Sequence, residues 1–181
     1  MNTFVVTAPE HRYFPPKGLK IFLAGGICKC SLWQQAIISF FTNESHELSP
    51  DFKDVYILNP RREDWLEAPG AAERQIEWEF DMIERCDVFT MYFARGESDQ
   101  PICMYELGRN IERMKERFPE SWQDRIIITC DSEYRRVNDV IVQTRLATDG
   151  LVNVNVQNTE YDAIKSHYSN INEKLKYIYS K

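Results

Sequence analysis

Short apolar runs alternate along this chain with longer segments that have helical periodicity. Strands are predicted at residues 1–18 (a short strand followed by a proline-containing connection), 19–24, 55–58, 87–94, 125–129 and 151–156, the last as an edge strand. Helices are predicted at residues 31–41, 71–85, 101–117, 137–147 and 160–179. Because strands and helices alternate, the pattern predicts an α/β fold of the doubly wound type with a mainly parallel sheet.

The same pattern predicts one domain over residues 1–181. It runs from an N-terminal strand and connection at 1–18 to a C-terminal helix within 157–181, and it contains no repeat or low-complexity tract. Ser31 is a candidate N-cap for the first helix. In the helix 71–85, Ile76, Phe80 and Ile83 form an apolar stripe that includes Glu79. The inner side of the last helix is predicted from helical spacing to carry Tyr161, Ile164, Tyr168, Ile171, Leu175 and Ile178.

Composition narrows the class of protein. The formal net charge of −6 over 181 residues argues against a nucleic-acid polymer as the main partner. We expect no secretory signal, and no apolar run approaches the ~20 residues of a membrane span. The five cysteines are odd in number and three of them flank predicted strands, which indicates reduced thiols in a cytoplasmic protein. Cys28 and Cys30 have no second Cys/His pair, so no metal site is expected.

Three segments follow predicted strands directly, where ligands bind in open α/β sheets. Gly25-Gly26 either allows close approach of a ligand or makes a tight turn. The segment 59–62 carries Arg61, which is predicted to point inward to hold a phosphate or pair with a carboxylate, although a solvated loop charge is the alternative. The segment 98–101 ends in Pro101, which opens the helix that carries Glu106.

Two carboxylates, Glu79 and Glu106, are predicted to meet in one pocket. Glu106 lies in the second turn of its helix, beside the core stripe, and its alternative role is that of a polar helix-surface residue. Paired carboxylates favour acid/base or nucleophilic chemistry, and burial together with the nearby charge of Glu106 predicts a raised pKa for Glu79. Histidine-dependent catalysis has no well-placed residue, since His11, His46 and His167 fall in unrelated segments.

A set of short motifs follows in a fixed order along residues 19–156. The motifs are residues 21–26, Trp33, 58–62, 75–79, 86–87, 101–102 and 105–109, followed by 133–136, 139–140 and 143–146. This ordered set resembles the nucleoside 2-deoxyribosyltransferase-like family, and Glu106-Leu107-Gly108 is its most specific piece. The resemblance implies a flavodoxin- or Rossmann-like sheet and cleavage of the N-glycosidic bond of nucleosides.

The resemblance also implies residue roles. Glu106 matches the nucleophile that forms a glycosyl-enzyme intermediate, Glu79 falls where an aspartate contacts the base, and Asp99 lies near another pocket aspartate. Phe22 stands in place of a strand tyrosine that helps position the nucleophile. Strand ends and resemblance together assign substrate binding to Phe22, Gly25, Gly26, Trp33, Asn59, Arg61, Trp78 and Pro101.

The function indicated is transfer of a (deoxy)ribosyl unit from a nucleoside to another nucleobase. Two alternatives stay open: a nucleoside 5′-monophosphate N-glycosidase, with Arg61 or Arg135-Arg136 holding the phosphate, and a nucleotide-binding sensor without turnover. Cleavage through an oxocarbenium-like transition state needs no cofactor or metal. Family resemblance and the tyrosine-rich last helix, with Tyr168, Tyr177 and Tyr179, predict a homo-oligomer.

Overall fold

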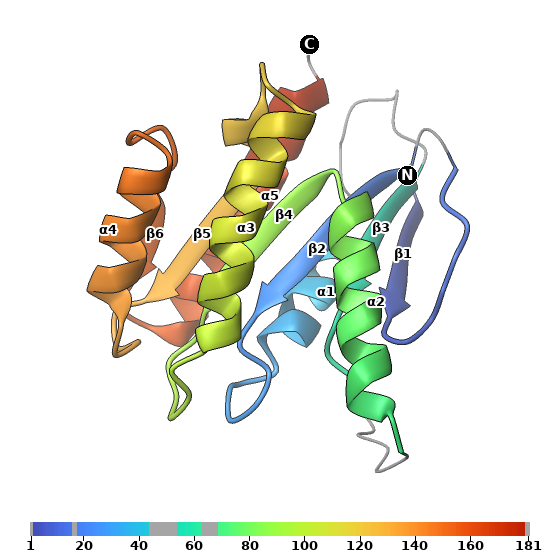
Figure 1. The fold of residues 1–181 in the computed structure, drawn as a ribbon, viewed down its shortest axis with the longest axis horizontal. Coiled ribbons are helices and arrows are strands. Elements are labelled where there is room, and N and C mark those ends of the chain that lie inside the picture. The colour runs from blue at the N-terminus through green and yellow to red at the C-terminus, as the bar shows by residue number, and fades with distance from the viewer. Residues whose placement is uncertain (1, 16–17, 44–53, 63–68, 180–181) are drawn as a thin grey trace.

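The computed structural model describes residues 2–15, 18–43, 54–62 and 69–179. Within these residues the chain alternates between strands and helices in the order that the sequence predicts (Figure 1). The strands are β1 (Asn2–Thr7), β2 (Leu19–Gly25), β3 (Asp54–Asn59), β4 (Val88–Phe93), β5 (Ile126–Asp131) and β6 (Val154–Gln157). The helices are α1 (Trp33–Asn43), α2 (Ala71–Arg85), α3 (Pro101–Arg117), η1 (Trp122–Asp124), α4 (Val137–Ala147) and α5 (Glu160–Tyr179).

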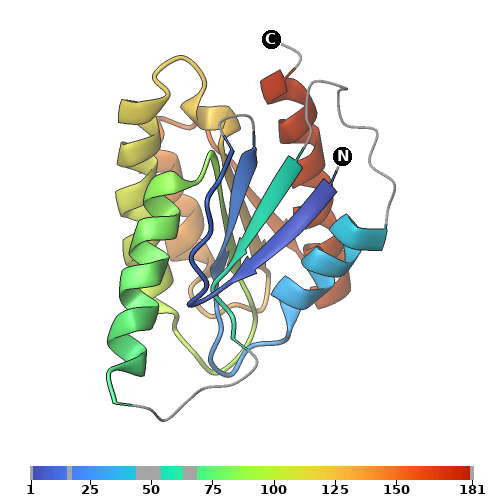
Figure 2. The same cartoon turned by 90° about the vertical axis from the view of Figure 1, so that its right-hand side faces the viewer.

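The strands form one sheet in the order β1-β3-β2-β4-β5-β6, and every neighbouring pair is parallel. Helices α2, α3 and α4 cover one face of the sheet, while α1 and α5 cover the other (Figure 2). This is a doubly wound α/β fold, as predicted, and β6 is the predicted edge strand. Because parallel strands are covered on both sides, β4 is buried at every position from Val88 to Phe93.

The core has two parts, one on each face of the sheet. Trp78, Leu107 and Met114 pack on the face that carries α2 and α3. Trp33, Ile171 and other residues pack on the face that carries α1 and α5. The two parts of the core hold the helices against the sheet. The loops that connect the strands to these helices therefore begin and end at well-packed elements.

The chain turns in opposite directions after two adjacent central strands. From β2 it passes to α1 on one face, and from β4 it passes to α3 on the other face (Figures 1 and 2). The two connections therefore diverge, which opens a crevice at the carboxyl edge of the sheet. Gly25 and Tyr92, which are paired in the β2–β4 register, lie beside this crevice.

Three local predictions were wrong. Ser31 does not cap α1, which begins at Trp33, and its Oγ has no hydrogen-bond partner among the described residues. In α2 the buried face is Gln75, Trp78, Met82 and Ile83, while Ile76 and Phe80 are 66% and 54% exposed.

In α5, Tyr161 is exposed instead of inward, and Ala163 and His167 lie buried on the inner side with Tyr168, Ile171 and Leu175. Ile164 and Ile178 are partly buried against the same part of the core, so of the six predicted inner positions Tyr161 alone is wrong. His46 lies outside the described residues.

Candidate active site

A cavity of about 350 Å³ lies at the carboxyl ends of β2 and β4, between the N-terminal parts of α2 and α3. Its volume falls within the ~300–1,000 Å³ range of small-molecule sites. Its walls are mostly apolar and combine short segments from across the sequence. They comprise Phe22, Ala24, Gly25, Gly26, Ile27, Cys28, Pro60, Ala72, Gln75, Ile76, Glu79, Ser98, Gln100, Pro101, Ile102, Cys103 and Glu106.

The start of α3 places Glu106 in the wall of this cavity. Pro101 begins the helix, and the preceding Gln100 takes up the left-handed conformation with φ 46° and ψ 49°. Leu107 and Ile111 are buried against the sheet, which turns the neighbouring Glu106 toward the crevice. Asn110 holds this turn by donating a hydrogen bond of 2.8 Å from Nδ2 to the backbone carbonyl of Glu106.

Helix α2 brings Glu79 to the same cavity. Trp78, which is 1% exposed, anchors the helix by packing on the sheet and donates from Nε1 to the carbonyl of Glu10 at 2.6 Å. Gln75, one turn before Glu79, donates from Nε2 to the carbonyl of Pro60 and to Glu79 Oε1, both at 2.7 Å. The Glu79 carboxyl is therefore held in one position by a buried amide.

Burial shifts the proton affinity of both carboxyl groups. It raises the pKa of Glu79, and the hydrogen bond from Gln75 opposes this shift. Burial and the nearby charge of Glu79 raise the pKa of Glu106 to about 7, against the opposing charge of Arg109. The raised pKa expected for Glu79 is thus confirmed. The effect of the neighbouring charge is found at Glu106 instead, because the charge of Glu79 raises the pKa of Glu106. Near neutral pH the pair holds a proton readily.

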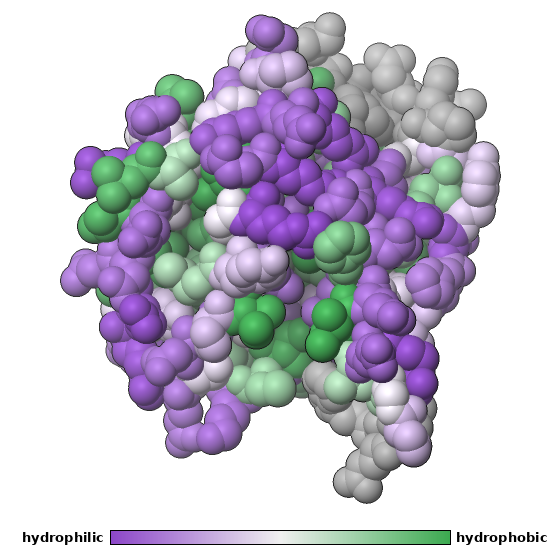
Figure 3. All heavy atoms as spheres, in the orientation of Figure 1, coloured by the Kyte–Doolittle hydropathy of each residue, from purple (hydrophilic) through white to green (hydrophobic). Residues whose placement is uncertain are grey.

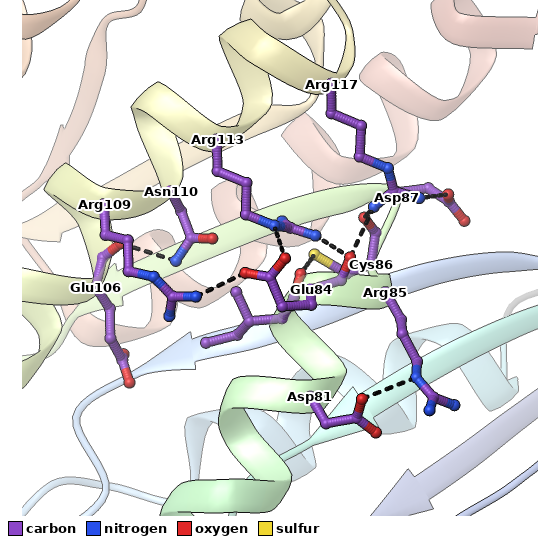
Figure 4. Close-up of polar contacts among 11 residues, drawn as sticks. Asp81, Glu84, Arg85, Cys86, Asp87, Glu106, Arg109, Asn110, Arg113 and Arg117 are labelled. Carbon is purple, nitrogen blue, oxygen red and sulfur yellow. Dashed lines mark hydrogen bonds and ion pairs between the residues drawn. The ribbon is translucent and has the colours of Figure 1, made fainter.

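Arg109 is directed away from Glu106 by a neighbouring acid. Its Nη2 lies 2.6 Å from Glu84 Oε1, and its guanidinium lies 4.1 Å from the ring centre of Phe80. Figure 4 shows this pair, with the Glu106 carboxylate pointing away from it. No described residue donates a hydrogen bond to that carboxylate, so it faces the cavity without a fixed partner.

Arg61 points inward, as predicted, but it binds the protein's own backbone. Its Nη2 lies 2.9 Å from the carbonyl of Ile27 and 2.7 Å from that of Ser31, and its Nε donates to Gln34 Oε1 at 2.8 Å. Asn59 in turn accepts from the backbone N–H of Arg61 and donates to its carbonyl. The predicted pairing of Arg61 with a phosphate or a pocket carboxylate is replaced by a structural role, in which it shapes the loop after β2.

The two glycines at the end of β2 lie in close contact with other parts of the protein. Gly25 has φ +148°, and a Cβ there would lie 2.3 Å from the carbonyl oxygen of Tyr92. A Cβ on Gly26 would lie 2.5 Å from Cys30 Sγ and 2.7 Å from Gln100 Oε1. Both glycines line the cavity, as predicted. Backbone atoms fill the space beside Gly25, whereas the space beside Gly26 holds the side chains of Cys30 and Gln100.

Four other predicted site residues lie outside the cavity lining. Trp33 is fully buried behind the loop and donates from Nε1 to the carbonyl of Gly26 at 2.9 Å. Trp78 faces the core and Asn59 holds Arg61, as described above. The carboxyl group of Asp99 is 51% exposed and lies 3.4 Å from Arg135. Its neighbours Ser98 and Gln100 line the cavity in its place, because the turn before α3 directs Asp99 outward.

The prediction omitted two buried amides. Gln75 and Gln100 line the cavity and are each 4% exposed. Gln75 precedes Glu79 by four residues and therefore shares its helix face, a signal present in the sequence. Gln100 has no comparable signal, since its placement depends on a left-handed turn. The cavity mouth is apolar, with exposed Ile76 and Ile102 beside it, and Figure 3 shows apolar surface gathered between α2 and α3.

Comparison with known families agrees with this geometry. The sequence model described as "nucleoside 2-deoxyribosyltransferase like" matches residues 18–118, more than half of the chain. The chain belongs to the nucleoside 2-deoxyribosyltransferase-like family. The family match includes β2, α2, β4 and α3, and hence all of the residues that line the cavity. It ends before the later motifs at residues 133–146, so the predicted resemblance is confirmed over residues 19–118.

Membership in the nucleoside 2-deoxyribosyltransferase-like family supports an enzyme that acts on the glycosidic bond of nucleosides, by transfer or hydrolysis. No curated protein shows a significant sequence match to the chain. Within the described residues, no helix is both long and apolar enough to cross a membrane. The described His, Cys, Asp and Glu residues include no group of three or more that is placed to hold a metal ion.

Proposed function

We propose that the protein cleaves the N-glycosidic bond of a (deoxy)nucleoside through Glu106 and transfers the (deoxy)ribosyl unit to another nucleobase. One observation carries the proposal: two carboxyl groups, Glu79 and Glu106, share one largely apolar cavity at the carboxyl edge of the sheet. A low-dielectric cavity strengthens the attraction between a carboxylate and a cationic sugar centre. Membership in a nucleoside deoxyribosyltransferase-like family supplies the substrate class.

In the first half-reaction the ionised Glu106 carboxylate attacks C1′ of the sugar. The C1′–N bond breaks, and its electron pair passes to the base nitrogen. Positive charge develops on the sugar in the transition state, and Glu106 opposes it directly. The form of the pair that reacts has its proton on Glu79, which burial of that carboxyl group assists, and Glu79 gives this proton to the departing base. The products are a glycosyl ester on Glu106 and a free neutral base.

In the second half-reaction a nitrogen of an incoming base attacks C1′ and displaces the Glu106 carboxylate. The proton lost by that base returns to Glu79, so both carboxyl groups regain their starting states. Water in place of the acceptor base would give hydrolysis by the same route. The proposal favours transfer because apolar residues such as Ile76 and Ile102 border the cavity and suit a flat heterocyclic acceptor.

The alternative substrate, a nucleoside 5′-monophosphate, finds less support in the cavity. Of the described residues that line it, none is Lys, Arg or His, and two are acids. Arg61 is held by loop carbonyls, and Arg135 lies with Asp99 on the surface. A dianionic phosphate near two carboxylates would be repelled, so we propose the nucleoside as the substrate.

The test is incubation of the purified protein with deoxynucleosides, ribonucleosides and their 5′-monophosphates, with and without acceptor bases. We expect new nucleosides when an acceptor base is present, and little free base without one. Release of base at an equal rate without an acceptor would assign a hydrolase, and turnover confined to monophosphates would assign the nucleotide substrate. Binding without either reaction would assign a sensor.

Mass spectrometry supplies a second, direct measurement. With a slowly turned-over nucleoside, the protein should gain the mass of one glycosyl unit, and Glu106→Gln protein should not. A single domain, a homo-oligomer and a cytoplasmic location stay predictions from the sequence. Sedimentation at micromolar concentration tests the oligomer, and a monomer there would contradict it.

A further inference from the structure

The loop between β4 and α3 is held by the end of β5 and the loop that follows it. Arg95 forms a bidentate ion pair with the fully buried Asp131, at 2.6 and 2.9 Å. Tyr134, which is 1% exposed, packs on Phe93 with 5.3 Å between the ring centres. Its hydroxyl donates a hydrogen bond of 2.6 Å to the backbone carbonyl of Asp99. A part of the chain outside the family match therefore supports one wall of the cavity.

The hydrogen bond from Tyr134 fixes the orientation of one peptide group. The carbonyl of that group belongs to Asp99, and its N–H belongs to Gln100 and donates to Ser98 Oγ at 3.2 Å. Both ends of the peptide group are thus held. The left-handed conformation of Gln100, with φ 46° and ψ 49°, depends on this orientation. Residues other than glycine adopt that conformation at a cost, so the contacts that hold the peptide group offset strain in the turn.

The same turn sets the start of α3. The carbonyl of Gln100 accepts the first hydrogen bond of the helix, from the N–H of Met104 at 3.3 Å. Gln100 Nε2 donates to the carbonyl of Ala94 at 2.7 Å, which ties the turn to the end of β4. Cys103 and Glu106 line the cavity from the first two turns of the helix. A rotation of the peptide group before Gln100 would therefore move both side chains.

We propose that Tyr134 is a positioning residue for cleavage at Glu106, because its hydroxyl holds the peptide group from which α3 starts. Without this bond the turn before α3 gains freedom, and the Glu106 carboxylate is no longer held in one place opposite C1′ of the sugar. This inference rests on the proposed function and adds to it a residue that does not line the cavity. The walls that β2 and α2 form do not depend on Tyr134, so the substrate should still bind.

Steady-state kinetics of Tyr134→Phe separate positioning from binding. Phenylalanine keeps the ring that packs on Phe93 and removes only the donor. We expect kcat to fall at least about ten-fold, because a small misplacement of a reacting group is costly, while KM changes less than about three-fold. Tyr134→4-aminophenylalanine keeps a donor on the ring and should retain kcat within about three-fold of wild type. Thr148→Val is the control: it removes another buried hydroxyl, which donates to the carbonyl of Thr144 at 2.8 Å, and should leave kcat unchanged.

Alkylation of Cys103 reports on the first turn of α3 without any turnover. Cys103 is 8% exposed and burial raises the pKa of its thiol, so iodoacetamide should modify it slowly in the wild-type protein. Cys86, at the end of α2, is 0% exposed and reports on opening of the whole fold. In Tyr134→Phe, alkylation of Cys103 should become at least about ten-fold faster relative to that of Cys86, as peptide mass spectrometry measures. A general loss of stability would accelerate both thiols and leave their ratio unchanged.

The outcomes separate this inference from the proposed function. A fall in kcat together with selective alkylation of Cys103 supports the inference. An unchanged kcat, a loss confined to KM, or no selective rise in the alkylation of Cys103 would overturn it while wild-type turnover upholds the proposed function. If Tyr134→Phe does not fold, loss of kcat in the 4-aminophenylalanine variant would overturn the inference, and retention would support it. Wild-type protein without turnover on any nucleoside would refute the proposed function, and the alkylation ratio would still decide whether Tyr134 holds the start of α3.

Discussion

Replacing Glu106 by glutamine should abolish turnover and, at alkaline pH, stabilise the fold. Glutamine keeps the shape of the side chain, so the packing beside Leu107 changes little. It has no charge to oppose an oxocarbenium-like centre and is not a competent nucleophile. Loss of this interaction should cost on the order of 3 kcal/mol in the barrier, or at least ~100-fold in rate.

The effect on stability follows from the pKa of Glu106, which burial raises from 4.5 to about 7. A raised carboxyl pKa means that the folded protein holds a proton that the unfolded chain has released. Stability therefore falls as pH rises from 4.5 through 7, by about 1.4 kcal/mol per unit and roughly 3 kcal/mol in all. Glutamine does not ionise, so the variant should escape this loss.

The assay is urea unfolding of wild-type and variant protein at pH 4 and pH 8. The stability of Glu106→Gln relative to wild type should increase by roughly 3 kcal/mol between the two values. Glu116→Gln, at an exposed position of the same helix, is the control and should show no such increase. A variant with near wild-type base release, or with no pH-dependent gain in stability, would refute the assignment of Glu106 as a buried catalytic carboxylate.

Three further changes test the surroundings of the site. Arg109→Met removes the cation that lowers the pKa of Glu106, so the acidic limb of the kcat/KM profile should move to higher pH, while the exposed control Arg85→Met should leave it in place. Burial lowers the pKa of His167 to about 3, so the stability of the wild-type protein should fall by about 1.4 kcal/mol per pH unit as pH drops from 6.5 toward 3. Acid unfolding curves of His167→Gln should show a shallower fall. Arg61→Lys loses the planar guanidinium contacts and should lower the unfolding free energy by ~1–3 kcal/mol in urea at neutral pH, and an unchanged midpoint would contradict the role of the loop contacts.

The sequence predicted the alternation of strands and helices because each element has a clear period and is bounded by polar or turn residues. Helices α2, α3, α4 and α5 begin and end where the pattern predicts. Glu106 was placed correctly for the same reason: Pro101 marks the start of the helix, and the position of the second turn follows from it.

Side-chain orientation was less predictable where the cavity interrupts the core. Ile76 and Phe80 have the spacing of a buried stripe, yet Ile76 lines the apolar cavity and Phe80 is 54% exposed beneath Arg109. Helix α2 is therefore rotated by about one residue from the predicted orientation. Periodicity does not distinguish an apolar rim from a core. The partners of Arg61 depend on a loop conformation that only the folded chain defines, which is why its inward direction was predicted and its contacts were not.

The contacts of Arg61 bear on how this protein can be redesigned. The guanidinium of Arg61, which follows β3, donates hydrogen bonds to the carbonyls of Ile27 and Ser31 in the loop between β2 and α1. It also donates to the side chain of Gln34 in α1. The loop and Arg61 therefore form a unit whose parts cannot be exchanged separately. A chimera that takes this loop from a relative must take the residues at positions 34 and 61 with it. The α2 wall contacts this unit through the hydrogen bond from Gln75 to the carbonyl of Pro60, so a redesign of α2 should keep Gln75 in place.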